Sequence, residues 1–266
     1  VGLLGSPCFE IPRMVERDQQ INAALSEDQR LDAIRRKNRY NLATAVLFLL
    51  ARLAFVFAAL LVAHVAMLNY QSVGILSLFA GGAALTVLSV VFFSLLERAS
   101  LGFKRLTPKI VSIYDPYFWW HERHWKLADT PIVGRFAGTP FKNLISRMVG
   151  LQVGRKVYDG GCSVTERSLT EVGDYVNLNE GSVLQAHSLE EGVLKSDYIR
   201  VGEGGTLGCG AFVHYGVVMG ERAVIDPDSF VMKGEVIDAQ TQWRGNPAKM
   251  LRRAVVRPSV EIGSGK

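Results

Sequence analysis

The sequence predicts a mixed fold, in which a two-helix transmembrane hairpin precedes a triangular β-solenoid of about four turns. Three observations predict it: two apolar stretches of membrane-spanning length, basic residues on the outer side of each stretch, and an aliphatic residue that recurs every six positions. The chain has 266 residues, of which 48% are hydrophobic, and this apolar excess is concentrated in a few segments. A wholly soluble protein is therefore not expected.

The first apolar stretch runs over 45–67 and the second over 75–96, with the short uncharged linker "LNYQSVG" between them. At 1.5 Å per residue each helix reaches roughly 33 Å, enough to cross about 30 Å of hydrocarbon. Lys and Arg gather at the outer ends, in the set Arg30, Arg35, Arg36, Lys37, Arg39, Arg98, Lys104, Arg105 and Lys109. The positive-inside rule therefore places both ends of the hairpin in the cytoplasm. A pair of buried core helices is the alternative.

Charge and cysteine usage narrow the classes of partner. The net charge is +5, and its basic clusters flank the apolar runs, which favours a lipid bilayer over nucleic acid as the partner. Arg52 lies inside the first span near its basic end, where it can snorkel to the headgroups or contact a partner helix or a water-filled path. Three cysteines show neither paired nor metal-ligand spacing, so no metal site is expected.

The solenoid is predicted by strict six-residue spacing. Seven aliphatic residues follow one another in this step: Val201, Leu207, Val213, Met219, Ile225, Val231 and Ile237. Val172, Leu178 and Leu184 keep the same step further upstream. In a triangular solenoid each hexad forms one short strand and one corner, three hexads form one turn, and the aliphatic residue fills the interior.

The rhythm stops between Leu184 and Val201, which are 17 residues apart, one short of three hexads. A stack of identical rungs has no pocket of its own, so we expect a loop that leaves the stack here and creates a cleft. The loop carries an unusual density of ionisable residues: His187, Glu190, Glu191, Lys195 and Asp197.

Several motifs carry a resemblance to known families. The stretch "TQWRGNPAKML" (241–251) resembles the terminal signature of hexapeptide-repeat acyltransferases, which are left-handed parallel β-helix enzymes. Longer stretches, among them "DPYFWWHERHWKL" (115–127), "GGCSVTERSLTEVGD" (160–174) and "LQAHSLEEGVLKSD" (184–197), resemble the C-terminal membrane region of non-ribosomal peptide synthetases of the ε-poly-lysine synthetase type. The resemblance implies a left-handed β-helix and acyl transfer that forms an amide or isopeptide bond.

The resemblance also implies candidate site residues. We expect His187 to act as general base, with Glu190 or Glu191 orienting its ring and His214 as the second choice of base. Five further residues are candidates for binding the amine acceptor or the acyl carbonyl: Glu166, Asn177, Asn179, Lys195 and Asp197. Each has a plain structural alternative, namely surface packing for the histidines, an ion pair for Lys195 and Asp197, and turn geometry for the two asparagines.

The implied donor is a phosphopantetheine-linked thioester supplied by a carrier domain, with no cofactor bound covalently to this chain; acetyl-CoA or another acyl-CoA is the alternative donor. Rival functions are a membrane-anchored coenzyme A-dependent acyltransferase acting on a sugar or lipid, and a scaffold without catalysis. The expected partners are the carrier domain, the lipid bilayer, and preceding tandem β-helix domains and transmembrane helices of the same polypeptide. The expected location is the bacterial cytoplasmic (inner) membrane, multi-pass, with the β-helix on the cytoplasmic side.

The chain divides into six expected parts. The stretch "LGSPCFEIPR" (4–13) parallels "RGNPAKMLRR" (244–253), so we expect the chain to begin with the tail of a preceding solenoid. The six parts are this tail (1–13), an amphipathic cytosolic or interfacial helix (14–41), the transmembrane hairpin (42–98), an aromatic interfacial linker with a lead-in helix (99–149), the β-helix domain (150–253) and a polar tail (254–266).

Overall fold

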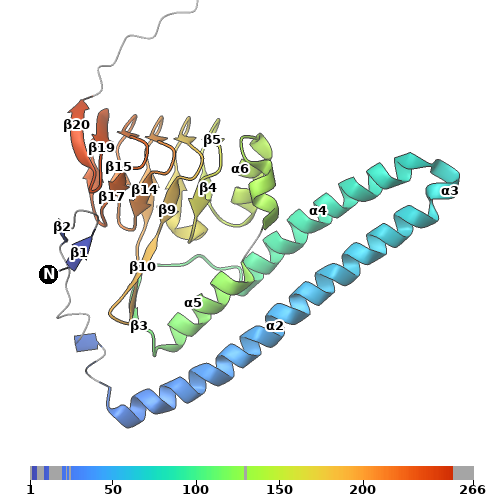
Figure 1. Ribbon diagram of the computed structural model, residues 1–266, viewed down its shortest axis with the longest axis horizontal. Helices are drawn as coiled ribbons and strands as arrows, with labels where there is room; N and C mark the ends of the chain where they lie inside the picture. Colours follow the sequence, from blue (N-terminus) through green and yellow to red (C-terminus); the bar gives the residue numbers. More distant parts are fainter. Residues whose placement is uncertain are drawn as a thin grey trace, which may run out of the picture.

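The computed structural model describes residues 2–4, 9–11, 20, 21, 23, 25–128 and 131–253, and the expected polar tail lies outside them. Two long helices run side by side away from a stack of short strands, and a shorter helix lies between the pair and the stack (Figure 1). Near the N-terminus, β1 (Gly2–Leu4) pairs antiparallel with β2 (Phe9–Ile11). The C-terminal strands β19 (Thr241–Arg244) and β20 (Lys249–Arg253) also pair antiparallel.

The long helices form the expected hairpin. Helix α2 spans Glu27–Leu68, α3 spans Tyr70–Val73 and α4 spans Ile75–Ser100. A capping box starts α2, because Ser26 accepts a hydrogen bond from the backbone N–H of Gln29 and the Gln29 side chain accepts one from the backbone N–H of Ser26. The basic segment and the first apolar stretch, expected as separate parts, thus belong to one continuous helix.

Small and aromatic residues bring the two long helices together. A Cβ added at Gly81 would lie 2.7 Å from the Cβ of Ala66, so the helices approach closely there. Further along, the Phe55 ring lies 4.8 Å from the Phe93 ring. Both helices are long and apolar enough to cross a membrane, and their apolar windows are 0% and 6% buried within the chain. The alternative of buried core helices does not fit this exposure.

The segment that follows the hairpin packs against protein. It contains β3 (Lys109–Ser112), α5 (Pro116–Leu127), the 3-10 helix η1 (Pro131–Phe136) and α6 (Pro140–Met148). We expected its aromatic rings in the membrane interface, but Phe118 and Trp119 are buried in a cluster with Ala33 of α2 and Leu194. The prediction was wrong for these two rings, because α5 is held between α2 and the strands beside it.

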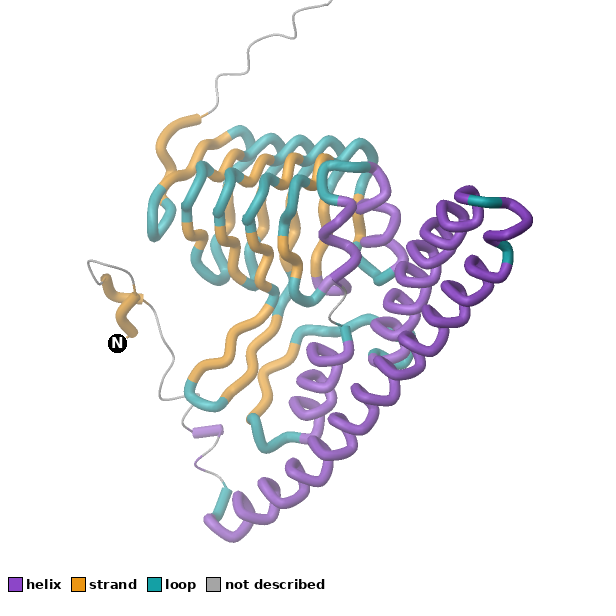
Figure 2. The backbone as a smooth tube through the Cα atoms, turned by 45° about the vertical axis from the view of Figure 1, so that its right-hand side comes forward, coloured by secondary structure: helices purple, strands orange, loops and turns teal. Residues whose placement is uncertain are grey.

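Most strands of residues 152–253 form three sheets, parallel except for the antiparallel β19–β20 pair, and their turns stack as a solenoid (Figure 2). One sheet holds β4 (Gln152–Val153), β7 (Thr170–Val172), β12 (Ile199–Val201), β15 (Val218–Met219) and β18 (Val236–Ile237). The second holds β5 (Tyr158–Asp159), β8 (Asn177–Leu178), β13 (Thr206–Leu207), β16 (Val224–Ile225), β19 and β20. The third holds β6 (Ser163–Val164), β9 (Val183–Gln185), β14 (Phe212–His214) and β17 (Phe230–Val231).

The strand register confirms the six-residue prediction. Val201 pairs with Met219, and Met219 pairs with Ile237, so that three hexads separate neighbours in the stack. All of the aliphatic residues that follow the step from Val201 to Ile237 are at most 3% exposed. These side chains fill the interior of the solenoid, and their burial is the main source of its stability.

Tight corners predict a stability difference between two glycines. A Cβ at Gly208 would overlap the backbone of the next turn, 2.7 Å from the carbonyl carbon of Asp226, whereas a Cβ at Gly134 meets no atom within 4 Å. We therefore expect Gly208→Ala to lower the free energy of unfolding by about 1–3 kcal/mol and Gly134→Ala to leave it nearly unchanged. Chemical denaturation of both variants measures this, and equal stability would contradict the close stacking.

The excursion predicted after Leu184 is present, but it is a β-hairpin and not an irregular loop. β10 (His187–Glu190) and β11 (Val193–Ser196) pair antiparallel, and β3 adds a third strand beside β11. The turn lies at Glu191 and Gly192, which have φ values of 50° and 72°. The hairpin leaves the stack and reaches towards α5 (Figure 2).

Candidate active site

A carboxylate and an imidazole meet where the hairpin leaves the solenoid. β6 and β9 pair in parallel, with Val164 opposite Leu184, so the residues that follow these strands lie side by side. Nδ1 of His187 is 2.8 Å from Oε1 and 2.9 Å from Oε2 of Glu166. The Glu166 side chain is fully buried, and that of His187 is 16% exposed.

Burial alone would raise the pKa of Glu166. Its effect is outweighed by hydrogen bonds from His121 and His187, by the charge of His187 and by a hydrogen bond from Thr165. Together they hold the pKa of Glu166 well below its usual range. Glu166 is therefore ionised at neutral pH. Since a carboxylate only accepts hydrogen bonds, the proton of a neutral His187 must lie on Nδ1. Its Nε2 then carries a free lone pair, as a general base requires.

Helix α5 covers this pair and contributes three of its contacts. Trp125 donates its indole N–H to Oε1 of Glu166 at 2.7 Å, and its ring centroid lies 4.6 Å from that of His187. Nε2 of His121 lies 3.3 Å from the same oxygen. Thr165, which precedes Glu166 in the chain, donates its hydroxyl proton to Oε2 of Glu166 at 2.5 Å. These contacts fix the carboxylate, and through it the imidazole.

The orienting residue differs from the one predicted. Glu190 binds Lys195 at 2.9 Å and Lys233 at 3.0 Å. Burial would raise the pKa of Glu190, but the two ammonium groups outweigh burial and lower this pKa. Glu191 is exposed at the hairpin turn. The position beside His187 belongs instead to Glu166, which we had expected to bind the acceptor. Being fully buried, Glu166 cannot meet a ligand directly.

His214 lies one strand away from His187. It pairs in register with Gln185 of β9, and its Nδ1 accepts the backbone N–H of Tyr215 at 3.0 Å. Burial, followed by the charge of Lys233, lowers its pKa to about 4. In the neutral ring the proton therefore lies on Nε2, which makes His214 a hydrogen-bond donor. This geometry favours His187 over His214 as the base.

The remaining candidates separate into those near the pair and those on another sheet. Asn177 lies on β8 and Asn179 follows it, while His187 follows β9 of a different sheet. Asn179 donates its amide to the carbonyl of Leu207 at 2.6 Å, so it holds a corner. Lys195 is buried beside Glu190. Asp197 is exposed, and its backbone N–H donates to the carbonyl of Ala186, the neighbour of His187.

Sequence reasoning missed the contacts that come from outside the solenoid. Arg167, next to Glu166, forms a 2.5 Å ion pair with Glu97, a residue of α4 that is 1% exposed. His121 and Trp125 were expected only as interfacial residues. Their spacing of four in α5 places both on one helix face and was the only available signal.

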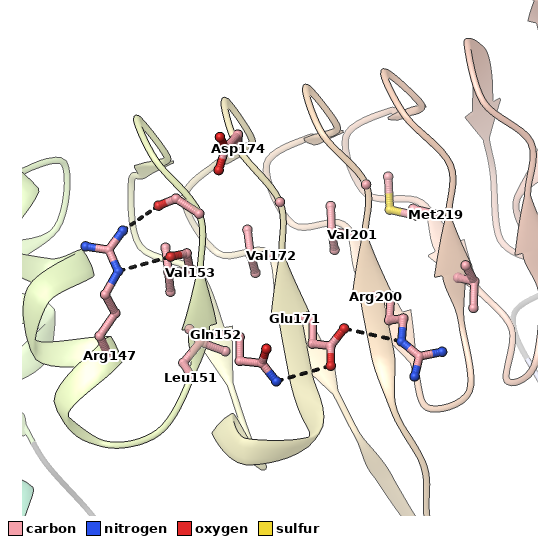
Figure 3. A pocket seen from close by; sticks show the side chains of 14 residues that line it. Arg147, Leu151, Gln152, Val153, Glu171, Val172, Asp174, Arg200, Val201 and Met219 are labelled. Carbon is pink, nitrogen blue, oxygen red and sulfur yellow. Dashed lines mark hydrogen bonds and ion pairs between the residues drawn. The ribbon is translucent and has the colours of Figure 1, made fainter.

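Among the residues that the structure describes, the buried thiol and the polar groove do not form a second reactive site. Burial raises the pKa of the Cys162 thiol to about 12, so it supplies no thiolate at neutral pH. Among the described residues no group of three or more His, Cys, Asp or Glu has the arrangement to hold a metal ion. A groove on another sheet contains a polar ladder from Gln152 through Glu171 to Arg200, with links of 3.2 and 3.3 Å (Figure 3). These groups bind one another.

The buried histidines predict a dependence of stability on pH. Burial, with a further contribution from His121, lowers the pKa of His124 to about 4, and its Nδ1 lies 2.8 Å from the Ser100 hydroxyl. In the unfolded chain a histidine titrates near 6.5, so the unfolded chain binds more protons between these values. The stabilisation is complete above about pH 6.5 and is lost as the pH falls towards 4.

Between pH 7 and 4, we expect the free energy of unfolding to fall by on the order of 3 kcal/mol less in His124→Gln than in the wild type. Thermal unfolding in detergent at a series of pH values measures it. His64→Gln, at an exposed position of α2, is the matched control. The same pH dependence in both variants would contradict the buried neutral ring.

The fold and site define a class: a parallel β-solenoid joined to two long apolar helices, with a carboxylate-oriented histidine where a hairpin leaves the stack. No protein-family profile matches the chain. A curated relative, Delta-poly-L-ornithine synthetase of Acinetobacter baumannii, is 27% identical over 185 residues, which cover 68% of this chain and 14% of the relative. The chain thus spans about a seventh of the relative's length. The expected resemblance to poly-amino-acid synthetases is confirmed.

Solved structures of acetyltransferases are similar to part of the chain. A maltose O-acetyltransferase from Clostridium difficile is 15% identical, with 60% of this chain and 97% of that chain covered and a TM-score of 0.45. A hexapeptide-repeat acetyltransferase from Vibrio cholerae, in complex with acetyl coenzyme A, is 17% identical, with 43% and 77% covered and a TM-score of 0.37. The strand pairing of this chain by itself defines the solenoid.

Proposed function

We propose that this chain is the membrane-embedded terminal region of a non-ribosomal peptide synthetase that transfers an aminoacyl group from a carrier-bound thioester to an amine. The observation that carries the proposal is the buried Glu166 carboxylate bound to Nδ1 of His187, with Nε2 left free. The similarity to a poly-ornithine synthetase supports the choice of an amine acceptor.

In the proposed reaction Nε2 of His187 takes a proton from the acceptor amine as its nitrogen attacks the thioester carbonyl. The nitrogen–carbon bond forms and the carbon–sulfur bond breaks. The imidazolium then returns its proton to the departing phosphopantetheine thiolate, so the products are one amide and one thiol. The charge of Glu166 stabilises the imidazolium, and the Trp125 indole and the Thr165 hydroxyl hold that carboxylate in place.

A basic amino-acid acceptor carries a second, charged amine that needs a carboxylate partner. Asp197 is the candidate, because it is exposed and its backbone is bonded to Ala186, beside the base. Its Oδ2 also lies near Gly216, two residues after His214. We assign no substrate contact to Asn177 or Asn179, because both lie on another sheet.

The proposed setting is the bacterial cytoplasmic membrane. The hairpin crosses it twice as part of a multi-pass chain, and the solenoid, left-handed and of about four turns, lies on the cytoplasmic side, where carrier domains deliver the donor. The basic outer ends and the exposed apolar windows of α2 and α4 support this placement. Preceding tandem β-helix domains of the same polypeptide would complete an intramolecular pseudo-trimer with this one.

A comparison of donors tests the proposal. The chain, reconstituted in lipid nanodiscs, is supplied with free ornithine and either a carrier loaded with labelled ornithine or labelled acetyl-CoA. We expect amide formation with the loaded carrier only. Turnover with acetyl-CoA alone would instead identify a coenzyme A-dependent acyltransferase. Acetyl-CoA is the molecule bound in the Vibrio cholerae structure. No turnover with either donor would favour a scaffold.

A further inference from the structure

A buried ion pair joins the last turn of α4 to the residue that follows the Glu166 carboxylate. Nη1 of Arg167 lies 2.5 Å from both carboxylate oxygens of Glu97, whose side chain is only 2% exposed. Arg167 begins the 3-10 helix η2 (Arg167–Leu169), directly after Glu166 in the chain. Because the pair is buried, the loss of one partner leaves the charge of the other poorly compensated.

The same turn of α4 borders the buried space around Glu166. The hydroxyl of Ser100 lies 2.8 Å from Nδ1 of His124. The His124 ring centroid is 6.3 Å from that of His121, and Nε2 of His121 lies 3.3 Å from Glu166. Besides burial and His121, the charges of Glu166 and Arg167 both act on the pKa of His124. The guanidinium and the carboxylate therefore lie close to the same buried ring.

Arg167 and His187 are rival partners for the Glu166 carboxylate. A guanidinium keeps its charge at every relevant pH and matches a carboxylate with two parallel hydrogen bonds, so it binds more strongly than a neutral imidazole. The attraction of opposite charges is also stronger where little water is present. Although Arg167 follows Glu166 directly, its Nη1 binds Glu97, and Glu166 keeps His187 at 2.8 Å.

We propose that Glu97 is a positioning residue for the reaction: by binding Arg167, it keeps the guanidinium away from Glu166 and leaves that carboxylate to His187. Without the Glu97 carboxylate, Arg167 turns to Glu166, and the His187 ring loses the acceptor that holds its proton on Nδ1. The end of a long apolar helix thus takes part in the site without touching the substrate. The inference rests on the function proposed above, in which His187 is the base.

Removal of one charge and then of both charges tests the competition. We expect Glu97→Gln to lower kcat for amide formation from the loaded carrier by about ten- to hundredfold, with little change in KM for the carrier, because the base is misaligned. The double variant Glu97→Gln with Arg167→Gln also lacks the competing cation and should recover most of this loss. A pair that only fastens α4 to the solenoid predicts no recovery, because the ion pair is missing from both variants.

Asp226→Asn is the matched control for the loss of a buried ion pair. Asp226 lies 2.5 Å from Arg244, and its side chain is 6% exposed. It follows β16, which belongs to a different sheet from the β9 strand that precedes His187. Asp226→Asn should therefore keep kcat. Thermal unfolding of every variant separates a loss of rate from a loss of folded chain.

The tautomer of His187 provides a readout that does not depend on turnover. NMR of the histidine ring nitrogens is recorded on the labelled chain in lipid nanodiscs, and His187→Ala identifies the signals of this ring. We expect a protonated Nδ1 and an unprotonated Nε2 in the wild type, in Asp226→Asn and in the double variant. In Glu97→Gln we expect a mixture of the two tautomers.

The outcomes separate this proposal from the catalytic one. Wild-type kcat and tautomer in Glu97→Gln would overturn the positioning role, as would an equal loss of kcat in Glu97→Gln and in the double variant. If Glu97→Gln does not fold, Arg167→Gln decides: it removes the cation and should keep the wild-type tautomer, and a mixture would contradict the proposal. An inactive wild type with the expected tautomers would overturn the proposed function and leave the positioning of His187 standing.

Discussion

His187→Ala is expected to lower the rate of amide formation from a loaded carrier by about 10²- to 10⁴-fold, the usual contribution of a general base. The reason is that His187 is partly exposed beside the carboxylate that fixes its orientation, whereas His121, which also contacts Glu166, is fully buried and cannot reach a substrate. We expect the loss to fall on kcat, because the base acts on the acceptor proton in the transition state. Single-turnover quenching with labelled carrier measures the rate of the chemical step.

Two controls separate catalysis from folding. His64→Ala makes the same change at an exposed position near the far end of α2 and should keep full activity. His214→Ala removes a ring whose nitrogen accepts the Tyr215 N–H, so it should affect stability more than the chemical step. If His187→Ala turned over normally while His214→Ala did not, the assignment of the base would be reversed.

Glu166→Gln is expected to reduce kcat by a similar factor while leaving the shape of the site almost unchanged. In the wild type, the two carboxylate oxygens share the contacts with these four side chains: His187, Trp125, Thr165 and His121. An amide has only one oxygen that accepts hydrogen bonds, and its NH₂ group donates them instead. The His187 ring then shifts its proton to Nε2, which removes the free lone pair. Disturbing the carboxylate of such a pair costs about 10⁴-fold in a serine protease.

The same substitution has a second, independent signature. In the unfolded chain the pKa of a glutamate is about 4.3. Because the pKa of Glu166 is lower in the folded chain, Glu166 stabilises the fold fully above this pH, and the stabilisation is lost as the pH falls below it. Glu166→Gln should therefore unfold with less dependence on acid pH. Glu171→Gln, in the polar ladder of the other sheet, is the control and should keep both kcat and the pH profile. A normal kcat in Glu166→Gln would rule out the orienting role.

The repeat predicted the solenoid well because its cause is local. Each aliphatic residue from Val201 to Ile237 must point inward for the stack to close, so the spacing gives the register, and Val201 does pair with Met219. The break after Leu184 marked the position of the excursion for the same reason. Its antiparallel hairpin and the third strand from residues 109–112 depend on pairing with a distant segment, which periodicity does not report.

The site was only half predictable. His187 stood out because it interrupts the repeat, but Glu166 was assigned to ligand binding, since its burial depends on a helix from an earlier segment. Regular spacing would not have found it, because the turn between Val164 and Leu184 has 20 residues instead of 18, and only this longer turn places Glu166 beside His187. Trp125 and His121 reach the carboxylate only because α5 docks there.

Chemical rescue is the most direct measurement of the central claim. His187→Gly opens a space bordered by the Trp125 ring and the Glu166 carboxylate, into which free imidazole fits as a replacement base. The account predicts that this variant forms no detectable amide from the loaded carrier in plain buffer and that the rate rises with imidazole concentration. Wild-type turnover by His187→Gly without imidazole would contradict it.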